Sequence, residues 1–476
     1  MKMTMLSVAL VASTGGADAM DNATPESQGV SSKAVSEWID ACERELDALH
    51  GFVIVRHGKV VAEGTWAPYD TLNRPHMLYS HSKSFTSTAI GLLVDDGVLD
   101  LDERVLDFFP DKAPEHPSSN LQALRIRDLL TMNVGASDAD AYNKDIHGDW
   151  VKAFLHNEID QTPGTVFKYD SCATHVLAAI VERKTGKPLM TFLKERLFDP
   201  LGMTSPWSTV SPTGVACGGW GMNMTTRDIA RFGQFLLNGG TWNDRRILSR
   251  DWITLATARQ TRSGPIEITG ESGTDWEQGY GFQFWRCRHN AFRADGACGQ
   301  FTIVMPDQDA VVSIHAGNND MQKEINLVWD ILLPAFDPSA LPEDDAAQRA
   351  LAAQCAALAL PVQTGTAPAP DKPFDNAVAS QNALGFTDVS LSRTDGGWTI
   401  SCKGGRRLAV GDGVWLTTSV TFTDTNIEQP FSLVGTRDVA ASGAWTEPGV
   451  LTVKFYVLGA PQHGSFSVRE HQTNTP

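Results

Sequence analysis

The sequence lacks any apolar run near the ~20 residues that a membrane-spanning helix needs. It is also poor in basic residues, with 39 Lys and Arg against 56 Asp and Glu, so the formal net charge is −17. Such a charge repels polyanions such as DNA. We therefore expect neither an integral membrane segment nor a nucleic-acid partner.

Cysteine is scarce and scattered. Seven cysteines occur without a C-x-x-C pair or a zinc-type spacing, and because the number is odd at least one thiol is free or bonded to another chain. This usage favours reduced thiols and a cytoplasmic location, and it supplies no pattern for a metal site.

The N-terminus favours a different location. Lys2 precedes a short apolar run over residues 5–12, and Ala17-Asp18-Ala19 has the small-residue pattern of a signal-peptidase site. Residues 1–23 are therefore either a secretory signal followed by a short segment, which would make the protein secreted or periplasmic, or an N-terminal extension.

A chain of 476 residues suggests two or three domains at about 150 residues each. Helical periodicity predicts a helix over residues 32–50, and two apolar runs predict a hairpin over 51–66. A mostly helical block follows to about residue 251, then several short strands and a closing helix. We predict an α+β domain over 24–336, in which one antiparallel sheet is flanked by helices and the helical block is an insertion.

The remaining residues change in character. Residues 337–372 read as a linker region with one short Ala/Leu helix and a Pro/Ala-rich stretch. Turn signals then separate β-rich segments over 373–476, which predicts a small antiparallel β barrel or sandwich.

Common hydrolase signatures are missing: the chain has no G-x-S-x-G, H-E-x-x-H or Walker A motif. It has one S-x-x-K, from Ser80 to Lys83. On a helix these side chains share a face, and a lysine whose pKa is lowered by desolvation can activate a serine. Backbone N–H groups at the helix start could stabilise an oxyanion. Alternatively, Ser80 merely caps the helix and Lys83 is a surface residue.

Residues 79–110, YSHSKSFTSTAIGLLVDDGVLDLDERVLDFFP, resemble the nucleophile region of the serine β-lactamase-like hydrolases. This superfamily includes class C β-lactamases, D-Ala-D-Ala carboxypeptidases (penicillin-binding-protein fold), D-aminopeptidases, S-x-x-K esterases and aminohexanoate-oligomer hydrolases. Five further segments resemble it in the same order: RIRDLLTMNVG, PGTVFKYDS, LFDPLGMT, NMTTRDIARFGQFLLNGG and ADGACGQFTIVMPDQDAVVSI.

The resemblance implies a role for each matching residue. Ser80 would be the acylated nucleophile, Lys83 would share its proton, and Tyr169 would be a second base with its phenol drawn toward phenolate by the lysine. The oxyanion hole would be the backbone N–H groups of Ser80 and Ala297, and Gly296 would let substrate approach the strand. The resemblance implies no metal and no organic cofactor. Tyr169 could instead be an ordinary loop residue.

Two positions depart from the family pattern. Where relatives have Lys or His in Lys/His-x-Gly, this chain has Ala294-Asp295-Gly296, so a substrate carboxylate would meet Asp295 unless Arg293 turned inward. The Asn of Tyr-x-Asn is Ser171. Both changes favour esters, amides or substrates with a cationic group over β-lactams.

Two histidines are weaker candidates. His81 would point away from Lys83 and is expected to be a wall or surface residue. His315-Ala316-Gly317 also spells H-x-G, but it ends an apolar strand after the matching segment, so we interpret it as coincidental.

The predicted function is therefore a serine hydrolase that cleaves an ester or amide of a small-molecule or peptide-like substrate through an acyl-enzyme. Alternatives are a β-lactamase or D-Ala-D-Ala carboxypeptidase, an acyltransferase using the same residues, or a non-catalytic binding protein whose C-terminal β domain is the interaction module. The sequence leaves the oligomeric state open.

Overall fold

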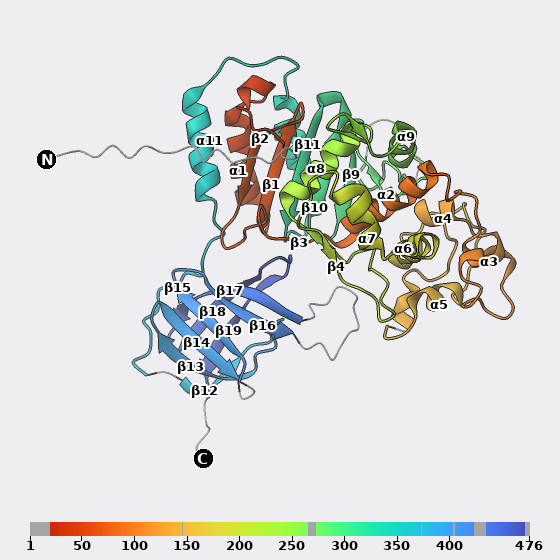
Figure 1. Cartoon of the computed structure of the whole chain (residues 1–476). Coiled ribbons are helices and arrows are strands. Elements are labelled where there is room, and N and C mark those ends of the chain that lie inside the picture. The colour runs from red at the N-terminus through yellow and green to blue at the C-terminus, as the bar shows by residue number, and fades with distance from the viewer. Residues whose placement is uncertain are drawn as a thin grey trace.

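The computed structural model describes residues 20–144, 146–264, 273–372, 374–402, 405–422 and 435–471 (Figure 1). The signal-like pattern over residues 2–19 therefore lies wholly outside the described residues. No helix within the described ranges is long and apolar enough to cross a membrane. All seven cysteines carry free thiols.

The centre of the larger part is a six-stranded antiparallel sheet that joins strands from both ends of the predicted hydrolase domain. The strand order is β2-β1-β11-β10-β9-β8. The strands are β1 (Leu49–Arg56), β2 (Lys59–Thr65), β8 (Trp285–Arg286), β9 (Phe292–Gly296), β10 (Gln300–Met305) and β11 (Ala310–Ala316). The N-terminal hairpin and the later strands thus share one sheet, as expected.

Helices cover both faces of this sheet, which is why every residue of β1, β10 and β11 is buried. On one face lie α1 (Ser32–Glu45) and α10 (Met321–Leu327), and the latter continues as further helical turns to Ala335. On the other face lies α8 (Thr226–Leu237), which packs against β1, β10 and β11. The first helix ends earlier than predicted, because Leu46 is extended and Leu49 already begins β1.

The inserted block is mainly helical. It contains α2 (Ser82–Asp95), α3 (Ser119–Ala123), α4 (Ile126–Leu130), α5 (Trp150–Leu155), α6 (Ser171–Thr185), α7 (Leu189–Leu193) and α9 (Arg250–Thr257). Short strands accompany them: β3 (His76–Met77), β4 (Trp207–Ser208) and β5 (Met222–Met224) form one small sheet, and β6 (Thr241–Trp242) pairs with β7 (Arg245–Arg246).

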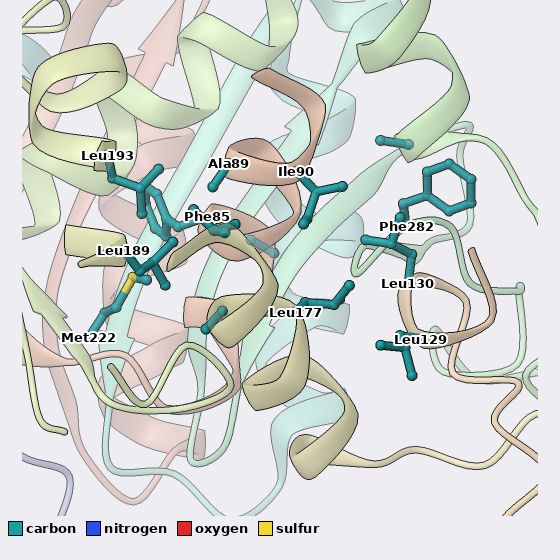
Figure 2. Packing of buried hydrophobic residues seen from close by; sticks show 14 of the residues in the cluster. Phe85, Ala89, Ile90, Leu129, Leu130, Leu177, Leu189, Leu193, Met222 and Phe282 are labelled. Carbon is teal, nitrogen blue, oxygen red and sulfur yellow. The ribbon is translucent and has the colours of Figure 1, made fainter. Parts of the chain in front are cut away.

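Helix α2 runs through the middle of the core. Phe85, Ala89 and Ile90 pack among leucines of the neighbouring helices (Figure 2). The polar residues of its first two turns are buried as well. A Cβ added at Gly91 would lie 2.4 Å from the Trp252 ring, so α2 and α9 are in close contact. A helix buried on all sides has little freedom to shift, and its N-terminal end therefore presents side chains in fixed positions.

The C-terminal part is a separate β structure with its own apolar core. After α11 (Asp345–Ala357) the chain forms an eight-stranded sheet in the order β15-β14-β13-β12-β19-β18-β17-β16, and an added parallel pairing of β15 with β17 closes it into a barrel. The strands are β12 (Phe374–Ala379), β13 (Asp388–Thr394), β14 (Gly397–Cys402), β15 (Arg407–Asp412), β16 (Leu416–Phe422), β17 (Gly435–Glu447), β18 (Val450–Val457) and β19 (His463–Glu470).

Candidate active site

The candidate nucleophile does not lie on α2 itself but in the 3-10 turn Tyr79–His81 that leads into it. Ser80 is partly exposed, whereas Lys83, in the first turn of α2, is only 1% exposed. The Lys83 Nζ lies 3.0 Å from the Ser80 Oγ. The change from 3-10 to α-helix thus preserves the one-turn spacing that the S-x-x-K pattern predicts.

Lys83 is held by three neutral oxygens. Its Nζ donates to the Ser80 Oγ at 3.0 Å, the Ser171 Oγ at 3.0 Å and the backbone oxygen of Gly219 at 2.7 Å. Burial disfavours the charged amine and lowers the pKa of Lys83 to about 7. The carboxylates of Asp140, Asp170 and Asp295 act in the opposite direction without cancelling the effect of burial. A substantial share of Lys83 is therefore neutral near pH 7.

Tyr169 faces the same pair. The Lys83 Nζ lies 4.7 Å from the centre of the Tyr169 ring, and Trp285 stacks on that ring at 5.7 Å. Burial raises the pKa of Tyr169 despite a hydrogen bond with Ser80 that lowers it. The expectation that Lys83 draws this phenol toward phenolate is therefore wrong: the amine lies over the ring face, and burial outweighs it. Burial thus favours the neutral phenol of Tyr169.

The start of α6 fixes Ser171 beside Lys83. Asp170 caps this helix, because its Oδ1 accepts from the backbone N–H groups of Cys172 at 2.8 Å and Ala173 at 3.2 Å. The same oxygen accepts from the Asp140 N–H at 3.1 Å, and Asp140 Oδ1 in turn accepts from the Ser171 N–H at 2.7 Å. Neither aspartate was predicted from the sequence, although an Asp directly before a helical run is a signal for a cap.

The two aspartates form a close acidic pair. Burial, and after it the charge of Asp140, raises the pKa of Asp170 to about 7. Together with Asp295 they surround Lys83 with negative potential, since all three act on its pKa.

Strand β9 runs directly against the turn that carries Ser80. A Cβ added at Gly296 would lie 2.0 Å from the Leu78 backbone oxygen and 3.2 Å from the His81 nitrogen. Any side chain at position 296 would collide with the backbone of the nucleophile turn. The glycine is therefore explained by packing within the protein, without the approach of substrate that the sequence suggested. Ala297 is exposed and directly follows Gly296, the residue at which β9 meets the nucleophile turn.

The cation of the family pattern is absent from β9, and Arg293 does not replace it at the surface. Arg293 is fully buried, and its Nε donates to Asp295 Oδ2 at 2.8 Å. The guanidinium carbon also lies 4.3 Å from the centre of the Trp276 ring. Asp295 is 8% exposed, and the buried Arg293 guanidinium balances the charge of its carboxylate. A buried ion pair thus takes the place of a cation that would face the substrate.

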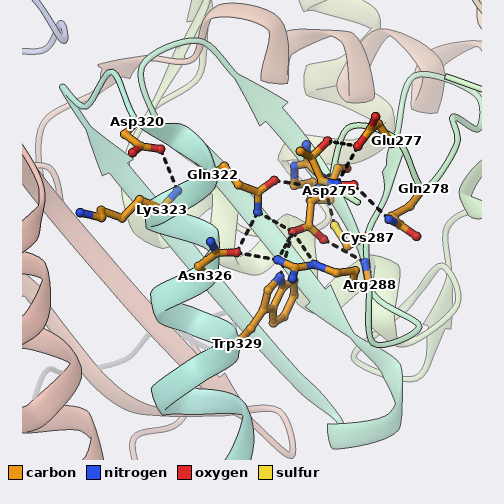
Figure 3. A network of polar contacts seen from close by, with 12 residues as sticks. Asp275, Glu277, Gln278, Cys287, Arg288, Asp320, Gln322, Lys323, Asn326 and Trp329 are labelled. Carbon is orange, nitrogen blue, oxygen red and sulfur yellow. Dashed lines mark hydrogen bonds and ion pairs between the residues drawn. The ribbon is translucent and has the colours of Figure 1, made fainter. Parts of the chain in front are cut away.

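A polar network anchors this ion pair to the last helix of the domain. Arg293 Nη1 donates to the backbone oxygen of Asp275 at 2.8 Å. The Asp275 carboxylate accepts from Arg288, Gln322 and Trp329 (Figure 3). Arg293 is therefore held by the Asp295 carboxylate through Nε and by the Asp275 backbone oxygen through Nη1, and both contacts oppose a swing into the site.

Both histidines singled out in the sequence lie in the core. His81 is fully buried and stacks on Phe85 at 5.8 Å, so it is not a surface residue. His315 is buried at the end of β11, where its Nδ1 lies 2.9 Å from Gln300 Oε1. The His315-Ala316-Gly317 sequence therefore lies at the end of β11, and not on β9, where the segment that resembles Lys/His-x-Gly lies.

Comparison with known proteins agrees with this arrangement. The Beta-lactamase family profile matches residues 39–331, more than half of the chain. The chain belongs to the Beta-lactamase family. It is therefore a hydrolase of the serine β-lactamase-like type, and its predicted acyl-enzyme chemistry is that of the family.

Among curated relatives, the 6-aminohexanoate-dimer hydrolase of Paenarthrobacter ureafaciens is 28% identical over 322 residues, which cover 63% of this chain and 81% of the relative. A D-aminopeptidase of Cereibacter sphaeroides is 29% identical over 185 residues, or 35% of each protein. The octameric penicillin-binding protein homologue from Pyrococcus abyssi matches 92% of this chain and 99% of its own, with a TM-score of 0.51 and 15% identity. That last likeness supports the fold alone.

Proposed function

We propose that this member of the Beta-lactamase family cleaves esters or amides through an acyl-enzyme on Ser80, with Lys83 as the base. The observation that carries the proposal is the buried Lys83 amine, held 3.0 Å from the Ser80 Oγ by neutral acceptors, with its pKa lowered to about 7. A general base works best when its pKa is close to the operating pH.

In the proposed acylation step, neutral Lys83 takes the proton of Ser80 while the Ser80 Oγ attacks the substrate carbonyl carbon. The backbone N–H groups of Ser80 and Ala297 stabilise the oxyanion. Tyr169 donates its phenol proton to the leaving alcohol or amine and is reprotonated from Lys83, so the phenolate exists only transiently. In deacylation, water attacks the ester carbonyl, the same groups remove its proton, and Ser80 regains its hydrogen.

We further propose that the site disfavours substrates with a carboxylate. Arg293 is committed to Asp295, and Asp140 and Asp170 add negative potential near Lys83. An anionic β-lactam would meet no free cation on β9, whereas a substrate with an ammonium group would be attracted. The names of the two curated relatives, a 6-aminohexanoate-dimer hydrolase and a D-aminopeptidase, agree with amides as a substrate class. The aminohexanoate dimer carries both an ammonium and a carboxylate, so it supports the attraction of a cationic group and not the exclusion of a carboxylate.

A substrate panel with an inactive variant tests the proposal. Wild type and Ser80→Ala are compared on p-nitrophenyl esters, D-amino-acid amides and nitrocefin, and for labelling by a fluorophosphonate probe. Ser80→Ala should abolish turnover and labelling. Hydrolysis of nitrocefin on the order of 10⁶ M⁻¹s⁻¹ would contradict the substrate preference. Labelling that survives in Ser80→Ala would contradict the nucleophile.

A further inference from the structure

The C-terminal barrel touches the segment that carries the nucleophile. The turn between β18 and β19, residues 458–462, lies along residues 75–79. The Met77 N–H donates to the Gly459 oxygen at 2.9 Å, and the Tyr69 hydroxyl donates to the Ala460 oxygen at 3.0 Å. Figure 1 shows the barrel below the end of the sheet where β3 lies. The barrel is thus docked onto the approach to Ser80.

One side chain of this turn reaches the residue next to the nucleophile. Gln462 Nε2 donates to the hydroxyl oxygen of Tyr79 at 2.6 Å. Tyr79 is 4% exposed, so this hydrogen bond is shielded from water. At the other end of the residue, the Ser82 hydroxyl donates to the Tyr79 backbone oxygen at 2.7 Å. Tyr79 is therefore held by α2 through its backbone and by the barrel through its ring.

The backbone of Tyr79 needs such support. Its φ is +48°, in the left-handed region that residues with a side chain rarely adopt. A conformation of this kind persists only where the surroundings fix it, and it occurs often at functional sites. The peptide bond that follows Tyr79 carries the Ser80 N–H, which is the proposed oxyanion donor. A rotation at Tyr79 would therefore turn that donor and displace the Ser80 Oγ from Lys83.

We infer that Gln462 is a positioning residue for catalysis: the barrel holds Tyr79 in its left-handed conformation and thereby aims the Ser80 N–H and Oγ at the substrate carbonyl. This inference rests on the proposed role of Ser80. The barrel thereby contributes to catalysis in the hydrolase domain. A reacting group that is misplaced by a fraction of an ångström lowers the rate more than it weakens substrate binding.

The test replaces Gln462 by methionine, which has a similar length and no hydrogen-bond donor, in the full chain. We expect Gln462→Met to lower kcat on a p-nitrophenyl ester about fivefold to tenfold, with KM within about twofold, and to slow fluorophosphonate labelling by the same factor. Tyr79→Phe removes the same hydrogen bond from the other side. The double variant should be no slower than either single variant, because both changes break one contact.

The matched control is Arg74→Gln. It breaks the ion pair between Arg74 and Asp438, 2.8 Å long, which also joins the two domains but does not touch Tyr79. We expect wild-type kcat for this variant, and thermal unfolding should be similar in all of them. The inference is overturned if Gln462→Met keeps wild-type kcat and labelling rate, if Arg74→Gln lowers kcat as much, or if the effects of Gln462→Met and Tyr79→Phe add. Residual labelling of Ser80→Ala would instead overturn the proposed function itself.

Discussion

Two buried basic side chains, one in the active site and one behind it, differ in charge because their surroundings differ. Lys83 on α2 donates to two hydroxyls and a backbone oxygen, and burial lowers its pKa to about 7. Arg293 on β9 donates to the Asp295 carboxylate, and it remains charged. Both side chains are 1% exposed or less.

The difference shows that burial alone does not decide what a cation does. A buried amine without an ion-pair partner within the described ranges can lose its proton and act as a base. A buried guanidinium keeps its charge because its intrinsic pKa is too high, so it requires a carboxylate and becomes structural. The base Lys83 on α2 and the permanently charged Arg293 on β9 thus lie on neighbouring elements.

Replacing Lys83 should have the largest effect. We expect Lys83→Met to lower kcat/KM on a p-nitrophenyl ester by about 10³-fold, because loss of a general base typically costs 10²- to 10⁴-fold. Lys83→Arg should be equally inactive, since it converts the base into a permanent cation like Arg293. The measurement is steady-state kinetics, with circular dichroism to verify folding.

An active Lys83→Arg variant would show that a positive charge, and not a removable proton, is what the site requires. The comparison between the two cations would then fail.

Breaking the ion pair between Arg293 and Asp295 should lower the stability of the fold. Asp295→Asn leaves the Arg293 guanidinium buried without its carboxylate, and we expect a loss of about 3 kcal/mol in the free energy of unfolding, measured in urea. The double variant Arg293→Met/Asp295→Asn removes the stranded charge and should recover most of this loss. Equal stability of the single and double variants would mean that Asp295 does not stabilise the fold through Arg293.

The pH dependence should follow Lys83. Because its pKa in the folded protein is lowered to about 7 from the ordinary 10.5, the amine is protonated below pH 7 and neutral above it. We expect kcat/KM to fall about tenfold for each pH unit below 7 and to level off above it. Initial rates are read at the isosbestic wavelength of p-nitrophenol. The falling part of the profile below pH 7, its acid limb, should be absent from the residual activity of Lys83→Met. A flat wild-type profile between pH 5.5 and 7.5 would exclude Lys83 as the titrating base.

The sequence predicted much of this site because the relevant signals are local or follow a known order. The one-turn spacing of Ser80 and Lys83 survives even though Ser80 lies in a 3-10 turn. The shared sheet could be predicted from strand patterns at both ends of the domain. The neutral state of Tyr169 could not, because it depends on where the Lys83 amine lies relative to the ring. Likewise, no spacing reveals that Arg293 folds back onto Asp295, or that Gln462 reaches Tyr79 from 383 residues away.

The smallest predicted effect concerns Ser171, which takes the place of the asparagine in the Tyr-x-Asn pattern that the sequence resembles. Ser171→Ala removes one neutral acceptor of Lys83, and we expect kcat/KM to fall about fivefold, as for loss of a hydrogen bond worth about 1 kcal/mol. Since this acceptor stabilises the charged amine, the pKa of Lys83 should decrease further and the acid limb should move to lower pH.

Ser171→Asn supplies an amide oxygen in place of the hydroxyl and should return the limb to near pH 7. Thr174→Val is the control, because it breaks a hydrogen bond to Gln283 one turn later on α6 without touching Lys83. If Ser171→Ala moves the limb to higher pH, or if Thr174→Val moves it equally, then the acceptors around Lys83 do not set its pKa, and burial alone separates the base from Arg293.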